Sequence, residues 1–383
     1  MKIAIISFPL RYNYGGIVQA YALQTVLQRM GHDITIIDYE DKCRINWLRF
    51  PFSLCKRIIQ RYIVGDKECK IFVEKEYNRE VNLKNQYIIP FINKNIFNRK
   101  FIRSFEKDIK SNEFDGYVVG SDQVWNPGHF TWLFQSSMSN AYLGFAEGWD
   151  VKRVAYAVSF GSKNWDYTEE QSASCKSLAR YFNGISVRED SGLQLCKQYL
   201  NVDAIHVLDP TLLLSKVDYL RLIPSCGVSA HKGQIFKYIL DKTTEKESIV
   251  NYISAIRHQA VFESNSQVDD LKASIKDRIQ PPVEQWLQAF VDADFVVTDS
   301  FHGTVFSIIF NKPFISIANY DRGLDRFTSL LKLFHLSNRL ISNVNDITDQ
   351  LISDIDYPCV NTIWDKWKTK SISFLSDSLR LDE

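Results

Sequence analysis

The chain has 383 residues, more than a single hydrophobic core usually serves, so two domains are expected. Hydrophobic residues make up 45% and charged residues 24% of the chain, which is typical of a globular protein and excludes a disordered one. The formal net charge of +1 excludes a molecule that is basic over its whole surface.

The first 40 residues have a βαβ pattern. We predict a β-branched strand at Ile3–Ser7, a loop at Asn13–Gly16, a helix at Ile17–Met30 and a second strand at Ile34–Ile37. A right-handed parallel crossover follows from this order. The apolar run at the N-terminus is too short for a signal peptide, and no stretch of the chain approaches the roughly 20 apolar residues that span a bilayer.

Between residues 42 and 110 the alternation of strands and helices is interrupted. The segments Trp47–Ile63 and Phe91–Ile109 look helical, so we predict a helical insertion on the first domain over about residues 42–110. This stretch carries 17 Lys and Arg against 7 Asp and Glu. A basic segment on a near-neutral protein indicates an acidic substrate or an anionic surface nearby, unless it is simply a solvated helical face.

The alternation of short strands and helices returns after residue 110. Strands are predicted at Gly116–Gly120, Val154–Phe160, Gly184–Val187 and Ala204–Leu208, and helices at Glu169–Phe182 and Glu189–Leu200. This order predicts a mostly parallel, doubly wound α/β sheet. Turn formers in residues 224–233 (PSCGVSAHKG) mark the end of the first domain, which we place at residues 1–225.

A second α/β domain is predicted over residues 232–360. Its strands are expected at Gln234–Leu240, Phe295–Thr298 and Pro313–Ala318, and its helices at Thr244–Arg257, Pro282–Val291, Phe301–Phe310 and Leu324–Phe334. An amphipathic C-terminal helix, Ile363–Leu379, is expected within residues 361–383. Two Rossmann-like domains imply a site at the C-terminal ends of the strands, so the loops after the strands are the places to search.

The first such loop contains Asn13, Gly15 and Gly16. Paired glycines let a backbone approach a ligand closely, and the N-terminus of the following helix offers unpaired N–H groups to an anion. The segment matches neither a dinucleotide-binding nor a Walker motif. An anionic-ligand site is the functional interpretation, and a tight turn without a ligand is the alternative.

The second loop follows an apolar strand and contains Asp122, Gln123 and Trp125. Polar groups beside an aromatic plane suit a sugar, whose hydroxyls need acceptors and whose apolar face can stack on a ring. The alternative is an Asx turn with Trp125 in the core.

The third loop begins with Arg188, directly after a predicted buried strand. A guanidinium there could grip a phosphate or a carboxylate in two places. An ion pair with Glu189, or one across the two domains, is the alternative.

The fourth loop, Thr298–Thr304, joins a strand to a helix and places His302 in the first helical turn. The positive end of a helix disfavours an imidazolium, so a neutral His302 could act as a base or donate a hydrogen bond. Asp299 is predicted to bind sugar hydroxyls, and Ser300 to contact an anionic ligand or to serve as the N-cap. A capped helix with a buried histidine is the alternative.

The fifth loop carries Arg322 and Arg326, which share one helical face because they are four residues apart. They could bind an anion in the cleft, or they could pair with Asp321 and Asp325.

The scattered cysteines and histidines do not form a metal-binding or disulfide pattern. The seven cysteines have no CxxC or paired spacing, which indicates reduced thiols and a cytoplasmic location. The seven histidines have no HxH or HExxH spacing, so no metal is predicted. The basic segment matches no nucleic-acid reader motif, so nucleic acid is not an expected partner.

Taken together, these loops resemble the polysaccharide pyruvyl transferase family. The resemblance is carried, in this order, by NYGGIVQAYALQ, YVVGSDQVWN, AVSFG, SVRE, LDPTLLL and VVTDSFHGTVFSIIFNKPFI, and it extends from residue 1 to about residue 340. It implies a GT-B-like architecture with two Rossmann-like domains. It also implies that phosphoenolpyruvate, with no further cofactor, donates its enolpyruvyl carbons to two hydroxyls of one sugar, giving a cyclic pyruvate ketal in a bacterial capsule or exopolysaccharide precursor.

By this resemblance, Arg188 and His302 match residues associated with the donor and the transfer step. Arg188 is assigned to an acidic group of the donor, and His302 to proton transfer or phosphate departure. Many members carry an arginine two residues before the histidine, where this chain has Ser300. Arg322 or Arg326 could replace that arginine, or the donor could differ.

The resemblance also implies an acceptor that is a glycan or a lipid-linked sugar at the inner face of the membrane. Trp47–Ile63, with Arg49, Lys56, Arg57 and Arg61, is a candidate for peripheral contact with anionic headgroups. Two other functions stay open: a GT-B glycosyltransferase that uses a nucleotide sugar, and a non-catalytic sugar-binding protein.

Overall fold

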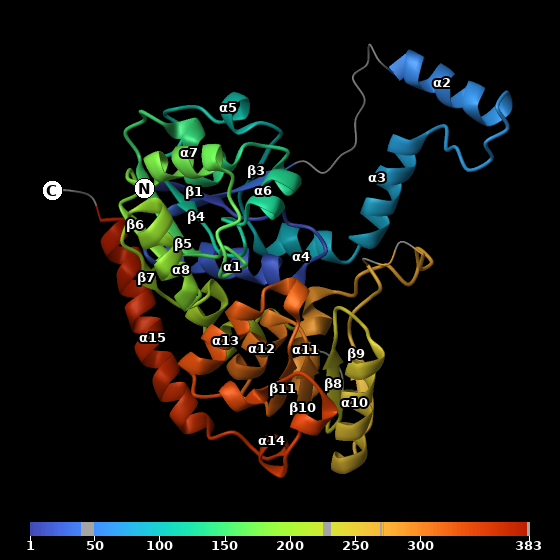
Figure 1. Ribbon diagram of the computed structural model, residues 1–383, viewed down its shortest axis with the longest axis vertical. Coiled ribbons are helices and arrows are strands. Elements are labelled where there is room, and N and C mark those ends of the chain that lie inside the picture. The colour runs from blue at the N-terminus through green and yellow to red at the C-terminus, as the bar shows by residue number, and fades with distance from the viewer. Residues whose placement is uncertain (40–49, 225–230, 269, 271, 381–383) are drawn as a thin grey trace.

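The computed structural model describes residues 1–39, 50–224, 231–268, 270 and 272–380. These residues form two parallel β-sheets with helices alternating between the strands (Figure 1). The α/β fold class predicted from the sequence is confirmed. Within the described residues, no helix has both the length and the apolar character needed to cross a membrane.

The N-terminal sheet has seven strands in the order β3-β2-β1-β4-β5-β6-β7. They are β1 (Lys2–Ile6), β2 (Asp33–Tyr39), β3 (Arg99–Ile102), β4 (Gly116–Val119), β5 (Lys152–Val158), β6 (Gly184–Val187) and β7 (Ile205–His206). In β1, Ile3 lies opposite Ile34 on one side and Gly116 on the other. The strand order reverses between β1 and β4, so the loops after these two strands diverge and leave room for a site.

The C-terminal sheet has five strands in the order β12-β11-β10-β8-β9. They are β8 (Ile235–Tyr238), β9 (Val261–Glu263), β10 (Phe295–Thr298), β11 (Phe314–Ile317) and β12 (Leu340–Ile341). Here the order reverses between β8 and β10, so the loop that leads to His302 starts at this second switch point.

Helices cover both sheets. Those in the N-terminal half are α1 (Tyr14–Arg29), α2 (Phe50–Tyr62), α3 (Val73–Lys84), α4 (Ile88–Asn95), α5 (Phe105–Asp108), α6 (Pro127–Phe134), α7 (Glu169–Ala179), α8 (Asp190–Leu195) and α9 (Lys216–Leu220). Those that follow are α10 (Thr244–Arg257), α11 (Val283–Asp292), α12 (Phe301–Ile309), α13 (Leu324–Leu333), α14 (Asp349–Ile352) and α15 (Tyr357–Ser378).

The predicted helix at Phe91–Ile109 is wrong. The chain there forms the end of α4, the edge strand β3 and the single turn α5. Arg99–Ile102 is a strand because it pairs with β2, with Arg99 opposite Ile36. A four-residue edge strand with two charged side chains has too little alternation of apolar and polar residues to be recognised in the sequence. Its structure depends on pairing with β2, which is distant in the chain.

Two sequence predictions fall partly on residues 40–49 and 225–230, which lie outside the described residues. The first is the start of the helical insertion at residue 42, together with the start of its first helix at Trp47. The helix that the structure describes, α2, begins at Phe50. The second is the domain boundary within residues 224–233.

The C-terminal helix α15 contacts both halves of the molecule. It begins at Tyr357, earlier than predicted, because Asp356 caps it and Pro358 occupies its first turn. Tyr357 Oη donates to the carbonyl of Ser307 in α12 at 3.3 Å, and Trp364 Nε1 donates to the carbonyl of Leu212 at 2.6 Å. Figure 1 shows this helix running down one side of the molecule, past both halves.

The two halves share one apolar core. Tyr14 of α1 stacks on Trp286 of α11 with ring centroids 5.2 Å apart, and Tyr219 packs edge-on against Phe306 at 4.9 Å. These contacts join α1 to α11 and α9 to α12 across the two halves.

Candidate functional site

The loop after β1 leaves room for a side chain from the other sheet. Asn13 caps α1 by accepting a hydrogen bond from the N–H of Gly16 at 3.4 Å. A Cβ on Gly15 would lie 2.1 Å from Nδ1 of His302. Gly15 is therefore required for the imidazole to pack against the start of α1, and the predicted residues Asn13, Gly15 and Gly16 lie beside His302.

The loop after β4 supplies a carboxylate in a left-handed conformation. Asp122 has φ +65°, which is uncommon outside glycine, and its Oδ1 accepts from Nη2 of Arg188 at 3.0 Å. Gln123 is also buried. Trp125 turns away into the core, where its Nε1 donates to the carbonyl of Ala141 and its ring stacks on Tyr142. Its exposed fraction is 0%, so in this conformation no sugar ring can stack on it.

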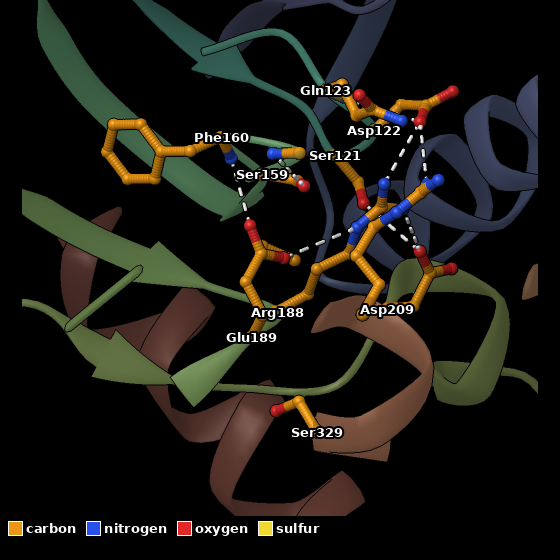
Figure 2. Close-up of polar contacts among 12 residues, drawn as sticks. Ser121, Asp122, Gln123, Ser159, Phe160, Arg188, Glu189, Asp209 and Ser329 are labelled. Carbon is orange, nitrogen blue, oxygen red and sulfur yellow. Dashed lines mark hydrogen bonds and ion pairs between the residues drawn. The ribbon is translucent and has the colours of Figure 1, made fainter. Parts of the chain in front are cut away.

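Arg188 lies between two aspartates directly after β6. Its Nη1 donates to Oδ2 of Asp209 at 2.9 Å, while Nη2 reaches Asp122 (Figure 2). Its Nε lies 3.9 Å from Oε2 of Glu189 and makes no hydrogen bond. The two aspartates therefore fix the guanidinium and leave one N–H unpaired.

Asp209 is the acceptor that links these loops. Besides Arg188, its Oδ2 accepts from Nε2 of Gln19 at 2.5 Å and from Oγ of Ser121 at 3.2 Å. The Nε2 of His302 lies 3.9 Å from the same oxygen. Asp209 was not among the site residues predicted from the sequence, although it belongs to the segment LDPTLLL that follows a predicted strand. Its distinguishing feature, proximity to residues from four separate segments of the chain, is not visible in a linear pattern.

Two residues of the C-terminal half complete the buried group. His302 lies in the first turn of α12, and Arg326 on α13 places Nη1 3.6 Å from Oδ1 of Asp122. The Phe301 ring lies near both guanidinium groups, 4.9 Å from Cζ of Arg188 and 5.3 Å from Cζ of Arg326. Arg188 and His302, predicted from separate halves of the chain, are thus brought together.

Burial and charge oppose one another in this group. Burial disfavours the charged form of Asp122, but Arg188 and Arg326 outweigh it and lower the pKa of this carboxyl to about 2. Burial and the nearby Arg188 lower the pKa of Arg326 to about 10. Burial raises the pKa of Glu189 despite the neighbouring Arg188.

His302 is a neutral imidazole in this environment. Burial lowers its pKa below the ordinary value of 6.5, and the two arginines add to that effect, although Asp209 and Asp122 partly oppose it. A neutral imidazole can accept a proton at one nitrogen while it donates from the other.

Four buried polar atoms of this group have no hydrogen-bond partner within the described part of the chain. They are Nε of Arg188, Oε2 of Glu189, Nε2 of His302 and Nε of Arg326. Unsatisfied buried polar atoms are costly and rare, and they mark sites where a ligand or a reaction supplies the partner. Arg188 and Arg326 can bind an anion, and the imidazole of His302 can accept a proton.

Three predicted residues have other partners. Asp299 accepts from the backbone N–H groups of Leu240 at 2.7 Å and Asp241 at 3.1 Å, and from Nζ of Lys246 at 2.7 Å. Ser300 caps α12 by accepting from the N–H of Gly303. Arg322 forms a two-pronged ion pair with Asp241. Their predicted roles toward sugar and donor stay predictions.

A hollow of about 800 Å³ lies elsewhere, between α2 and α3. Its lining includes Phe50, Phe72 and Leu83. None of its lining residues belongs to the buried group, so we place the candidate site at the buried group, where the titratable side chains converge.

Comparisons with known proteins give the family and the fold. The family model described as polysaccharide pyruvyl transferase matches residues 13–322, most of the chain. A comparison with curated protein sequences found no match.

Among solved structures, UGT89C1 of Arabidopsis thaliana, complexed with UDP-L-rhamnose, is 9% identical over 99% of each chain, with a TM-score of 0.51. The glycotransferase of kitacinnamycin is 12% identical over 99% of each chain, with a TM-score of 0.47. The UDP-GlcNAc 2-epimerase of Methanocaldococcus jannaschii is 13% identical over 96% of this chain and 94% of its own, with a TM-score of 0.44. The first likeness, at this identity, shows the fold alone, and it confirms the predicted GT-B architecture.

Proposed function

The chain belongs to the polysaccharide pyruvyl transferase family, and on this premise we propose that it transfers the pyruvyl group of phosphoenolpyruvate to two hydroxyls of one sugar in a surface polysaccharide precursor. The product would be a cyclic pyruvate ketal. The observation that carries the proposal is the buried group in which unpaired N–H groups of Arg188 and Arg326 accompany the neutral His302. An anionic donor needs the N–H groups of the two arginines, and a proton transfer needs the neutral imidazole.

The chemistry balances with these groups alone. A proton adds to the methylene carbon of the donor, and a sugar hydroxyl oxygen bonds to its C2. The bond from C2 to the phosphate oxygen then breaks, and a second hydroxyl oxygen takes its place. One hydroxyl proton ends on the new methyl group and the other on the departing phosphate, so the reaction needs no oxidant or reductant.

In this proposal Arg188 and Arg326 hold the phosphate and the carboxylate of the donor. Asp122 and Asp209 hold Arg188 in place before the donor arrives, so little ordering entropy remains to be lost. His302 receives a hydroxyl proton and delivers it to the methylene carbon or the phosphate. Arg326 stands in for the arginine that Ser300 replaces, because it enters the group whereas Arg322 is paired with Asp241.

Donor identity is tested first by ligand-dependent thermal stability. A true donor stabilises the folded state by mass action, so phosphoenolpyruvate should raise the melting temperature and UDP or GDP sugars should not. The opposite result would favour the nucleotide-sugar glycosyltransferase, whose fold this chain shares.

Activity is tested by phosphate release in the presence of candidate glycans, with the ketal methyl group detected by NMR. His302→Asn and Arg188→Lys should each slow release by at least about 10²-fold, because they remove a proton carrier and a two-pronged donor respectively. The exposed His335→Asn and Arg221→Ala are matched controls that should retain the wild-type rate. Unchanged release in both site variants would refute the assignment, and phosphoenolpyruvate binding without release would favour a non-catalytic protein.

A further inference from the structure

Helices α2 and α3 form an arm, residues 50–84, that stands away from both sheets (Figure 1). Neither helix contains a buried residue. A globular domain does not need such an element for its core, so the arm is free to serve another contact.

One side of α2 packs against the rest of the arm. Arg57 forms a two-pronged pair with Glu74 through Nη1 at 2.8 Å and Nη2 at 2.5 Å, and Arg61 donates to the carbonyl of Cys69 at 2.9 Å. These bonds set the orientation of α2 relative to α3, so the opposite side of α2 faces outward.

The outward side of α2 is apolar and exposed. Its large hydrophobic residues are Phe52, Ile59, Tyr62 and Ile63, with exposed fractions of 79%, 48%, 71% and 77%. Lys56 lies one turn from Phe52 and from Ile59, on the edge of the same side, and is also exposed. We call these five residues the α2 face. Contiguous exposed apolar residues of this size mark an interaction site rather than ordinary surface.

The positive charge of α2 indicates an anionic partner. The helix contains Lys56, Arg57 and Arg61 and no acidic residue. Arg57 and Arg61 are bonded within the arm, and Lys56 borders the apolar face. An apolar face with aromatic residues and a basic side chain at its edge is the pattern of a helix that lies in a membrane interface. With 13 residues α2 is too short to span a bilayer, which requires roughly 20.

The base of the arm lies beside the candidate site. The carbonyl of Lys84, the last residue of α3, accepts from the N–H of Gln280 at 3.1 Å. Nε2 of Gln280 in turn donates to the carbonyl of Tyr12 at 3.1 Å, next to the cap residue Asn13. Helix α3 has 12 residues and is therefore about 18 Å long, so it holds α2 away from the base of the arm.

We propose that the α2 face docks the protein on an anionic lipid bilayer. Apolar side chains enter the boundary between headgroups and acyl chains, and Lys56 meets anionic headgroups. The part of the inference that concerns substrate rests on the proposed function: the arm would hold the site near a sugar carried on a lipid.

The test is flotation of the full chain with phosphatidylcholine vesicles, with and without phosphatidylglycerol. Binding is expected only with the anionic lipid, and it should weaken as salt rises. The double variant Phe52→Glu with Ile63→Glu should bind the vesicles more weakly by about tenfold or more, since each change places a carboxylate where an apolar side chain enters the bilayer. Tyr181→Glu with Tyr252→Glu changes two exposed tyrosines away from the arm and should bind like the wild type.

Three results would overturn the inference. The wild type could fail to float with anionic vesicles, or both double variants could lose binding equally. Alternatively, sedimentation velocity could find a dimer that only the arm variant breaks, without vesicle binding, which would assign the α2 face to a second copy of the chain. A chain that floats but releases no phosphate from phosphoenolpyruvate would retain this inference and reject the proposed function.

Discussion

His302 occupies a space that a glycine of the other half of the molecule leaves open. Gly15 and Gly16 are neighbours at the start of α1, yet their surroundings differ. A Cβ on Gly15 would clash with the imidazole, whereas a Cβ on Gly16 would meet only Asn13 side-chain atoms at 3.8 Å. The pair therefore offers a matched test of how His302 is positioned.

We expect Gly15→Ala to displace the imidazole and to slow phosphate release by about 10²-fold, because misplacing a reacting group by about 1 Å costs that much. Gly16→Ala should keep the wild-type rate and fold. Steady-state kinetics with circular dichroism would check both. A Gly15→Ala protein with the wild-type rate would show that the packing of His302 does not matter for the reaction.

Asp209 partly offsets the effect of burial on the proton affinity of His302. Its Oδ2 lies 3.9 Å from Nε2, and its charge raises the imidazole pKa against the effect of burial. Asp209→Asn should therefore lower the pKa of His302 further, as followed by NMR of ¹³C-labelled histidine. Asp241→Asn, which removes a partner of Arg322 instead, is the control. An unchanged or raised pKa in Asp209→Asn would contradict this role.

The lowered pKa of His302 also has a consequence for stability. The unfolded imidazole takes up a proton near pH 6.5, while the folded one resists it. The contribution of this residue to stability is therefore present above about pH 6.5 and is lost as the pH falls through the lower folded value.

At the scale of elements, the first turn of α12 combines a cap with the site. Ser300 accepts from the N–H of Gly303 and so satisfies one of the free donors at the start of the helix. Asp299 just before it holds the loop after β8 by accepting from the backbone N–H groups of Leu240 and Asp241. These two residues secure the start of the helix that carries His302.

Ser300→Ala should lower the free energy of unfolding by about 1 kcal/mol, the usual cost of losing a cap. Ser248→Ala, on the exposed face of α10, should change it by less than about 0.5 kcal/mol. Denaturant titration measures both. Equal effects of the two substitutions would mean that the Ser300 cap contributes nothing.

At the scale of the whole molecule, a single apolar core and the helix α15 join the two sheets. The core includes Ile5 of β1 and Val296 of β10. Trp364 of α15 is 9% exposed and bonds to the carbonyl of Leu212, while Tyr357 of the same helix bonds to α12. The candidate site lies between the two halves of the molecule, and this helix bonds to both of them.

Trp364→Ala should destabilise the protein by about 3–5 kcal/mol, since it removes a large buried side chain and a hydrogen bond. Trp132→Ala removes an indole that is 67% exposed and should have a small effect. The wild type should unfold in one cooperative transition because the halves share a core. Separate transitions for the two halves of the wild type would contradict this view.

Local patterns in the sequence determined the strands of the α/β alternation and the helix α1. Strands such as β1 and β10 are continuous apolar runs, and the start of α12 carries the cap residue Ser300, so neighbours along the chain suffice to define them. Helix α1 begins at Tyr14, before the predicted Ile17, because Asn13 caps it. The same reasoning selected Arg188 and His302, because polar residues directly after buried strands gather at one edge of a sheet.

Only the tertiary structure decided the remaining features. The edge strand β3 depends on pairing with β2, and the burial of Trp125 depends on the ring of Tyr142. Gln19 meets Asp209 across 190 residues of chain, and Gly15 meets His302 across the two halves. Such contacts depend on how sheets and loops pack in space, and no spacing along the chain encodes them locally.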